Sequence, residues 1–132
     1  MRVMLDTNVL VSLLLFPHSR MNGMMERIFA EHELVLSSFV LDELKAVVAR
    51  KFPGKEPAVD RFLLEMSYDL VYTPETMDRA LFTIRDAKDY PVLYTAVIEN
   101  VDVLITGDRD FAGARVEKPE VLTPADFIEK YL

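Results

Sequence analysis

The 132-residue sequence contains no cysteine and only two histidines. Without cysteine there is no disulfide framework and no thiolate metal site. His18 and His32 lack the spacing of a histidine metal pair, which argues against a zinc site. The lack of disulfide chemistry makes the cytosol the default compartment.

Long hydrophobic runs are also missing. The longest one, from Val9 to Phe16, is interrupted by Ser12 and ends at Pro17, well short of the roughly 18 residues that span a membrane. Strand-like sequence begins at Arg2, where a signal peptide would have its basic region. We therefore expect a cytoplasmic protein that does not enter a membrane.

Positive charge is scarce, and the net charge is −7. Proteins that bind long nucleic acids through phosphates are usually basic, because lysine and arginine displace counterions. Either nucleic acid is not the ligand, or a local basic surface and bound cations overcome the overall field. Surplus carboxylates usually form a solvated surface, whereas carboxylates that converge at strand ends would indicate a site.

The alternation of short apolar segments with helical segments predicts a single α/β domain over residues 1–132, a three-layer sandwich with a mainly parallel central sheet. Strands are expected at residues 2–5, 34–36, 70–72, 101–105 and 121–122. A first helix is expected to follow the polar step Asp6-Thr7-Asn8 and to run to about residue 15, and further helices are expected at residues 23–31, 38–52, 58–67, 74–84 and 91–99, and from residue 124. Thr73 and Pro74 resemble the N-cap and first-turn proline of the helix over 74–84.

Two aspartates directly follow predicted strands. Asp6 follows the first strand, and Asp108 follows the strand that ends at Ile105, after the exit residues Thr106 and Gly107. In open α/β sheets, ligands bind outside the carboxyl ends of the strands. One such aspartate is more often a helix cap than a catalytic group, but two in one sheet favour a functional site.

Two further carboxylates lie on the inner edges of predicted helices. Glu43 lies three residues after Val40 and four before Val47, at the edge of an apolar stripe. Asp89 precedes Val92 and Leu93 by three and four residues, so it belongs to the buried side of its helix. Taken alone, Glu43 would be an ordinary glutamate at the edge of the buried helix face, and Asp89 would be a helix N-cap. Asp86 lies one turn before Asp89, and Asp42, beside Glu43, falls on the outer face.

Several half-buried carboxylates cannot all remain ionised without a counter-charge. A hard cation such as Mg²⁺ or Mn²⁺ takes oxygen ligands and keeps waters for chemistry. Such a cation can activate water and neutralise a scissile phosphate. The pattern therefore favours phosphodiester hydrolysis, although this chemistry is not unique to it.

Four segments give the sequence a resemblance to the PIN-domain family, within the group of VapC-like toxins of toxin–antitoxin pairs. They occur in family order, and the similarity extends along the whole chain. The segments are Val3–Leu10, Ser38–Leu44, Arg85–Leu93 and Leu104–Phe111.

The resemblance implies an endoribonuclease that uses Mg²⁺ or Mn²⁺, and an RNA substrate. Its metal-binding and catalytic positions fall on Asp6, Glu43, Asp89 and Asp108, and its polar helpers on Thr7, Asn8 and Thr106. Asp86 competes with Asp89 and Asp110 competes with Asp108; Asp89 is preferred for its inward helical position and Asp108 because it follows the strand. Arg85, Lys88 and Arg109 flank the cluster, where surface solubilisation is slightly favoured over RNA-phosphate contact.

The resemblance also implies protein partners. A homodimer and an antitoxin are expected, and the methionine-bearing segment from Met21 to Met25 is a candidate groove for an antitoxin segment. The same methionines can equally serve as adaptable packing residues.

Two other functions compete with the nuclease. A non-catalytic binding module would be expected to have lost one of the four carboxylates, but all four are present. A phosphotransfer enzyme or receiver-like domain would use Asp6 as nucleophile. Phosphatases of that kind carry an aspartate two residues later, where this chain has Asn8, and no lysine near Thr106 fits a receiver.

Overall fold

The computed structural model describes the backbone of residues 1–132 and every side chain except that of residue 112. Five strands form one parallel sheet in the order β3-β2-β1-β4-β5. The strands are β1 (Arg2–Leu5), β2 (Glu33–Ser37), β3 (Asp69–Val71), β4 (Val103–Ile105) and β5 (Glu120–Leu122). The helices are α1 (Thr7–Leu15), α2 (Arg20–Glu31), α3 (Ser38–Lys51), α4 (Glu56–Glu65), α5 (Tyr90–Ile98) and α6 (Pro124–Tyr131), with 3-10 turns η1 (Ala87–Asp89) and η2 (Arg109–Gly113).

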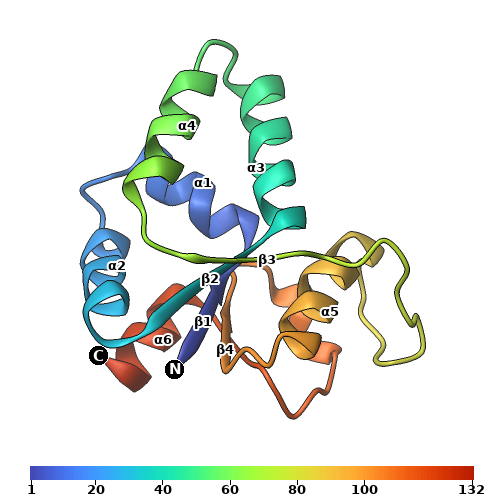
Figure 1. Cartoon of the computed structure of the whole chain (residues 1–132). Helices are drawn as coiled ribbons and strands as arrows, with labels where there is room; N and C mark the ends of the chain where they lie inside the picture. Colours follow the sequence, from blue (N-terminus) through green and yellow to red (C-terminus); the bar gives the residue numbers. More distant parts are fainter.

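The sheet lies in the middle of the molecule with helices on both sides, α2 and α6 to the left and α5 to the right in Figure 1. Every residue from Val3 to Leu5, Leu34 to Leu36 and Val103 to Ile105 is at most 2% exposed. Strands covered on only one face would alternate between buried and exposed residues, so this continuous burial shows that both faces are covered. The predicted three-layer α/β architecture is confirmed.

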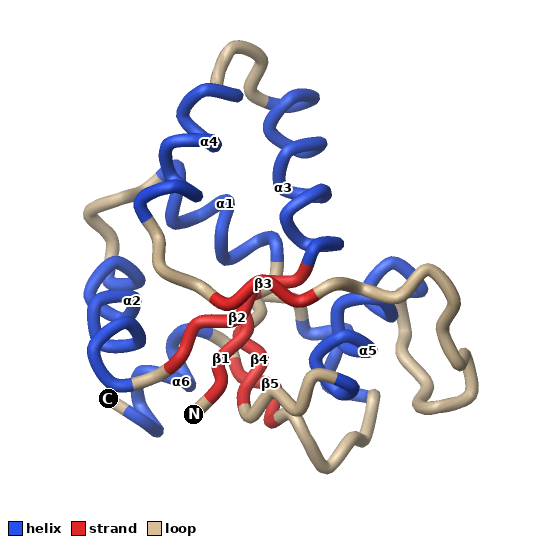
Figure 2. Tube along the Cα trace, viewed as in Figure 1, coloured by secondary structure: helices blue, strands red, loops and turns tan.

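The strand order brings the ends of β1 and β4 together. Leu5 pairs with Ile105, so the residues that follow them, Asp6 and Thr106, leave the sheet side by side. Figure 2 shows the strands meeting the beginnings of α1 and α3 at the centre of the molecule. This edge of the sheet, where the parallel strands end, holds the candidate site.

Short polar caps fix where the helices begin. The Ser37 hydroxyl accepts a hydrogen bond from the Val40 amide at 3.2 Å at the start of α3, and Thr123 does the same for Asp126 at 3.1 Å in α6. Such caps satisfy amides that have no partner inside the helix. The α3 helix ends before Gly54, whose φ of +89° suits glycine because it has no Cβ.

The predicted helix between Thr73 and Ile84 was wrong, because this segment has no regular structure. The Thr73 hydroxyl, expected as an N-cap, instead accepts a hydrogen bond from Thr95 on α5 at 2.8 Å. The Asp78 carboxylate accepts one from the Ala80 amide at 2.9 Å, a local turn that competes with helix formation. The other predicted strands and helices match the structure within three residues at each end.

The methionines of α2 do not form a partner groove. Met24 and Met25 are 2% and 4% exposed and belong to the hydrophobic core, and Met21 packs against it. Of the two roles open from the sequence, the structure shows packing. Within the described part of the chain, no helix combines the length and apolar character needed to cross a membrane.

Candidate active site

Asp6 lies at the centre of the site and is held in one orientation. It is 4% exposed and occupies the N-cap of α1. Its Oδ1 accepts a hydrogen bond from the Thr7 amide at 2.7 Å, and its Oδ2 accepts from the Thr106 hydroxyl at 2.7 Å and the Asn8 amide nitrogen at 3.3 Å. The carboxylate is therefore preorganised by its neighbours on both sides of the sheet edge.

Polar side chains connect the ends of β1 and β4 to α3. Asn8 accepts a hydrogen bond from the Gly107 amide at 3.0 Å, which ties the start of α1 to the loop after β4. Thr7 donates its hydroxyl hydrogen to the Glu43 carboxylate, so Glu43 on α3 is held next to Asp6. The edge of α3 that carries Glu43 therefore faces the start of α1.

Four aspartates come from the segments before α5 and after β4. Asp86 caps η1 by accepting from the Lys88 amide at 3.0 Å, and Asp108 caps η2 by accepting from the Asp110 amide at 2.8 Å. Carboxylate oxygens of Asp86, Asp89 and Asp110 lie within 4.8 Å of one another. Asp89 is the N-cap of α5, so this helix starts directly at the acidic cluster.

The clustering changes the acidity of two groups. Burial raises the pKa of Asp6 above its usual value, against the hydrogen bonds from Thr106 and Thr7 that lower it, and nearby acidic groups raise it further. Burial raises the pKa of Asp89 to about 8, helped by a hydrogen bond and charge repulsion from Asp108. Both shifts show that the protein alone does not fully compensate the negative charge here.

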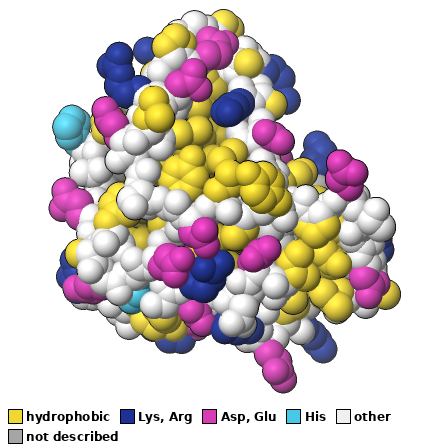
Figure 3. All heavy atoms as spheres, in the orientation of Figure 1, with side chains coloured by type: hydrophobic (Ala, Val, Ile, Leu, Met, Phe, Trp, Pro, Cys, Tyr) yellow, Lys and Arg dark blue, Asp and Glu magenta, His cyan; other side chains and the backbone are white. Residues whose placement is uncertain are grey.

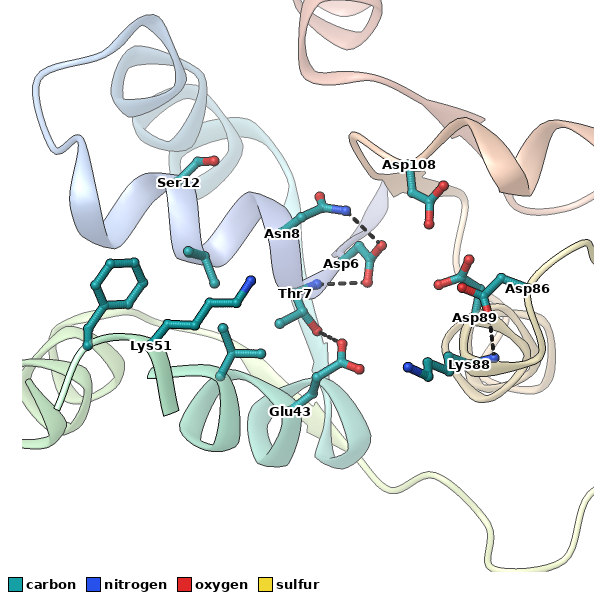
Figure 4. Close-up of a pocket in the computed structure, with 13 residues that line it drawn as sticks. Asp6, Thr7, Asn8, Ser12, Glu43, Lys51, Asp86, Lys88, Asp89 and Asp108 are labelled. Atoms are coloured by element: carbon teal, nitrogen blue, oxygen red, sulfur yellow. Dashed lines mark hydrogen bonds between the residues drawn. The ribbon is translucent and has the colours of Figure 1, made fainter. Parts of the chain in front are cut away.

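The carboxylates surround an open pocket of about 460 Å³. Figure 4 shows Asp86, Asp89 and Asp108 facing Asp6, Thr7 and Glu43 across it. The pocket is lined by the acidic residues Asp6, Glu43, Asp86, Asp89 and Asp108, the lysines Lys51 and Lys88, the polar residues Thr7, Asn8 and Ser12, and the apolar residues Val11, Val47 and Phe52.

The donor set fits a hard divalent cation. Asp89 Oδ2 is buried, yet no hydrogen-bond donor reaches it from any described residue. Asp110 has a partial counter-charge, since Arg85 lies 3.7 Å away, while Asp6 has three donors of its own. A buried carboxylate oxygen without a donor, beside other carboxylates, is the environment that a Mg²⁺ or Mn²⁺ ion satisfies.

The structure brings together most residues that the sequence singled out. Asp6, Glu43, Asp89 and Asp108 share the pocket, as do the helpers Thr7 and Asn8, and Thr106 contacts Asp6 from behind. Asp86 lines the same pocket, and Asp110 lies beside it next to Asp86 and Asp89.

The three basic residues that were predicted to flank the cluster lie in three different places. Lys88 lines the acidic pocket, Arg85 is 84% exposed and pairs with Asp110, and Arg109 lines a different depression beside Thr123. Ser12, Lys51 and Phe52 line the pocket but were missed from the sequence. Lys51 was within reach, because Glu43, Val47 and Lys51 follow one another at four-residue spacing on one face of a helix.

Solved structures similar to the chain include the following two. One is VapBC2 from Rickettsia felis bound to a DNA fragment from its promoter, with a TM-score of 0.69 and 22% identity over 92% of this chain and 97% of that chain. The other is VapC20 of Mycobacterium tuberculosis, a toxin that cleaves the sarcin–ricin loop, with a TM-score of 0.58 and 14% identity over 83% and 92% of the two chains. At these identities the likeness shows a shared fold. No curated protein sequence matches the chain.

The family model described as the PIN domain matches residues 2–110. This range contains β1 to β4, all of α1 to α5, and every carboxylate of the pocket. The chain belongs to the PIN domain family.

Proposed function

We propose that this protein is a metal-dependent endoribonuclease and the toxin of a toxin–antitoxin pair. The observation that carries the proposal is the arrangement of Asp6. A buried carboxylate, fixed by three hydrogen bonds, faces a group of carboxylates across an open pocket at the carboxyl edge of a PIN-family sheet. VapC20, one of the similar structures, is a toxin that cleaves the sarcin–ricin loop, which supports RNA as the substrate.

Asp6, Glu43, Asp89 and Asp108 would hold one or two Mg²⁺ or Mn²⁺ ions, with Asp86 and Asp110 next to Asp89. When bound there, such an ion would neutralise charge on the scissile phosphate and lower the pKa of a water molecule. The chain itself supplies the orientation. Thr106 and Thr7 fix two of the carboxylates, so that little reorganisation is needed when the substrate binds.

Lys88 would contact the substrate directly. Its amine points into the pocket toward Glu43 in Figure 4, and it forms no ion pair with any described carboxylate. A lysine in this position can bind a phosphate oxygen of the RNA and offset the repulsion between an acidic protein and a polyanion.

A protein partner is part of the proposal. Leu64 on α4 is 86% exposed and Phe16 at the end of α1 is 62% exposed, and Figure 3 shows an apolar hollow between α3 and α4. Contiguous exposed apolar surface marks interaction sites in many proteins. Together with the likeness to VapBC2, this surface leads us to expect an antitoxin partner, and we also expect a homodimer.

The decisive experiment is cleavage of defined RNAs with Mn²⁺, with Mg²⁺ and with a chelator. We expect cleavage only with metal, and a loss of at least about 100-fold in Asp6→Asn, whose shape is unchanged but whose charge is gone. Asp42→Asn is the matched control, since Asp42 is exposed on α3 and lies outside the pocket. Activity that survives chelation, or an Asp6→Asn protein that cuts like the parent, would return the binding-module alternative to first place.

Toxicity is tested separately by expression in a bacterial host from an inducible promoter. The parent should arrest growth, while Asp6→Asn at the same protein level should not. Growth arrest by both proteins would show that the effect does not come from RNA cleavage.

A further inference from the structure

The pocket extends well beyond the carboxylates, along a groove between α1 and α3. On α3 the residues Glu43, Val47 and Lys51 line it in succession. Eight residues of helix separate the first from the last, which corresponds to about 12 Å along the helix axis. On α1 the groove continues from Thr7 to Ser12. The acidic cluster is therefore one end of an elongated site.

The far end has a different chemistry from the acidic end. Its lining includes the Lys51 side chain, the Ser12 hydroxyl and the half-buried Phe52 ring. Lys51 forms no ion pair with a carboxylate of the described residues. Figure 4 shows its side chain lying along the groove with the amine directed toward Thr7, while Lys88 enters from the opposite side.

We propose that this far end is a nucleotide subsite, which binds the RNA nucleotide next to the scissile phosphate; this inference rests on the proposed ribonuclease function. The Phe52 ring carries the base by stacking, and Lys51 binds the phosphate between this nucleotide and the next. The Ser12 hydroxyl is a partner for the base edge or the ribose 2′-hydroxyl. Single-stranded RNA is recognised by this combination of aromatic, cationic and hydroxyl groups.

The charge distribution favours a nucleotide over other occupants. Five carboxylates line one end of the pocket, and the only cations lining it, as far as the structure describes the chain, are Lys51 and Lys88. An RNA strand that places one phosphate among the carboxylates and their metal ions has its neighbouring phosphates on either side. The two amines occupy those flanking positions, where they can bind phosphate without entering the metal site.

The stacking role is tested with an RNA hairpin whose cleaved bond has been mapped. In a set of otherwise identical hairpins, one nucleotide at a time around that bond is made abasic, and kcat/KM is measured for each. With the parent protein, one abasic position adjacent to the cleaved bond should lower kcat/KM by about 10-fold or more. Phe52→Leu should lower kcat/KM on the intact hairpin by a similar factor and should show no further loss on the abasic one.

Two variants separate stacking from folding. Phe52→Tyr keeps an aromatic face and should restore the parent pattern, while melting temperatures check that Phe52→Leu is folded. Phe29→Leu is the matched control, because Phe29 on α2 is 41% exposed and does not line the pocket. If Phe52→Leu retains the parent's full abasic penalty, the stacking assignment is wrong.

The phosphate contact is tested through the salt dependence of KM. For single strands, each phosphate contact contributes about 0.7 to the slope of log affinity against log salt concentration. Lys51→Gln should reduce the slope by about this amount. Arg50→Gln, with the same change in net charge one residue away and outside the pocket, should leave it unchanged.

The outcomes distinguish this inference from the function on which it rests. A parent protein that cleaves no RNA with either metal defeats both. A parent that cleaves RNA, with Phe52→Leu and Lys51→Gln indistinguishable from their controls, defeats the subsite alone. That second result is expected if the groove instead receives a segment of a protein partner.

Discussion

Asp89 should make the free energy of unfolding fall as the pH rises, which is the opposite of the usual effect of a carboxyl group. Burial and the neighbouring Asp108 raise the pKa of this carboxyl from 3.8 to about 8. At pH 7 the unfolded chain has released this proton and the folded, metal-free protein still holds it. At about 1.4 kcal/mol per pH unit, the interval from 3.8 to 7 means that the free energy of unfolding at pH 7 is reduced by at most about 4 kcal/mol.

The real cost is smaller, because the half-buried carboxyl borders an open pocket and solvent screens it. We expect about 1–2 kcal/mol after this discount. The sign follows from proton linkage. The folded state binds the proton more tightly than the unfolded state, so stability is fully present below about pH 4 and is lost as the pH rises toward 8. Asp89→Asn removes the titrating group and should flatten this dependence.

The assay is thermal unfolding of the metal-free parent and Asp89→Asn between pH 4 and pH 8. The two proteins should have similar melting temperatures at pH 4, and Asp89→Asn should melt about 4–8 °C higher at pH 8. Added Mn²⁺ should stabilise the parent more than the variant, because ligand binding to the folded state adds stability. A difference between the proteins that does not change with pH, or a less stable variant at pH 8, would refute the reasoning. Asp42→Asn, on the exposed face of α3, is the control.

Three other substitutions test the supports of the site and the fold. Thr106→Val removes the buried hydroxyl that donates to Asp6 at 2.7 Å; it should lower the free energy of unfolding by about 1–3 kcal/mol in urea titrations and reduce cleavage, whereas Thr106→Ser should retain both. Tyr90→Phe removes the hydrogen bond that Tyr90 donates to the Asp78 carbonyl; it should cost about 1 kcal/mol and speed tryptic cleavage in the segment between β3 and η1. Leu104→Ala empties a fully buried position in β4 and should cost about 2–5 kcal/mol, with the catalytic pH profile of the remaining folded protein unchanged.

Periodicity and position were enough to predict much of the fold and several site residues. The continuous apolar runs at Val3–Leu5 and Val103–Ile105 fixed a doubly covered parallel sheet, since such runs satisfy both faces. A parallel sheet in turn gathers residues that follow its strands at one edge, which is why Asp6 and Asp108 could be paired from the sequence. Glu43 was identified from helical spacing. Residues three or four positions apart share a helix face, and Glu43 stands at those distances from Val40 and Val47.

Only tertiary structure decided the features that depend on contacts between distant segments. The segment after β3 does not form its predicted helix, and its Thr73 accepts a hydrogen bond from Thr95 on α5, a contact with a distant segment that local sequence does not encode. The sequence favoured Asp89 over Asp86 and Asp108 over Asp110 by position alone, and left the competing residues open. The structure places all four in or beside one cluster and leaves Asp89 as the one with a buried oxygen that lacks a donor.

Lys51 and Phe52 lie far along the chain from Ser12, and only the packing of α3 against α1 makes them the opposite end of the same pocket. Local propensity and periodicity depend on neighbours in sequence, whereas a pocket depends on which helix faces pack together, and that is decided by the folded chain as a whole.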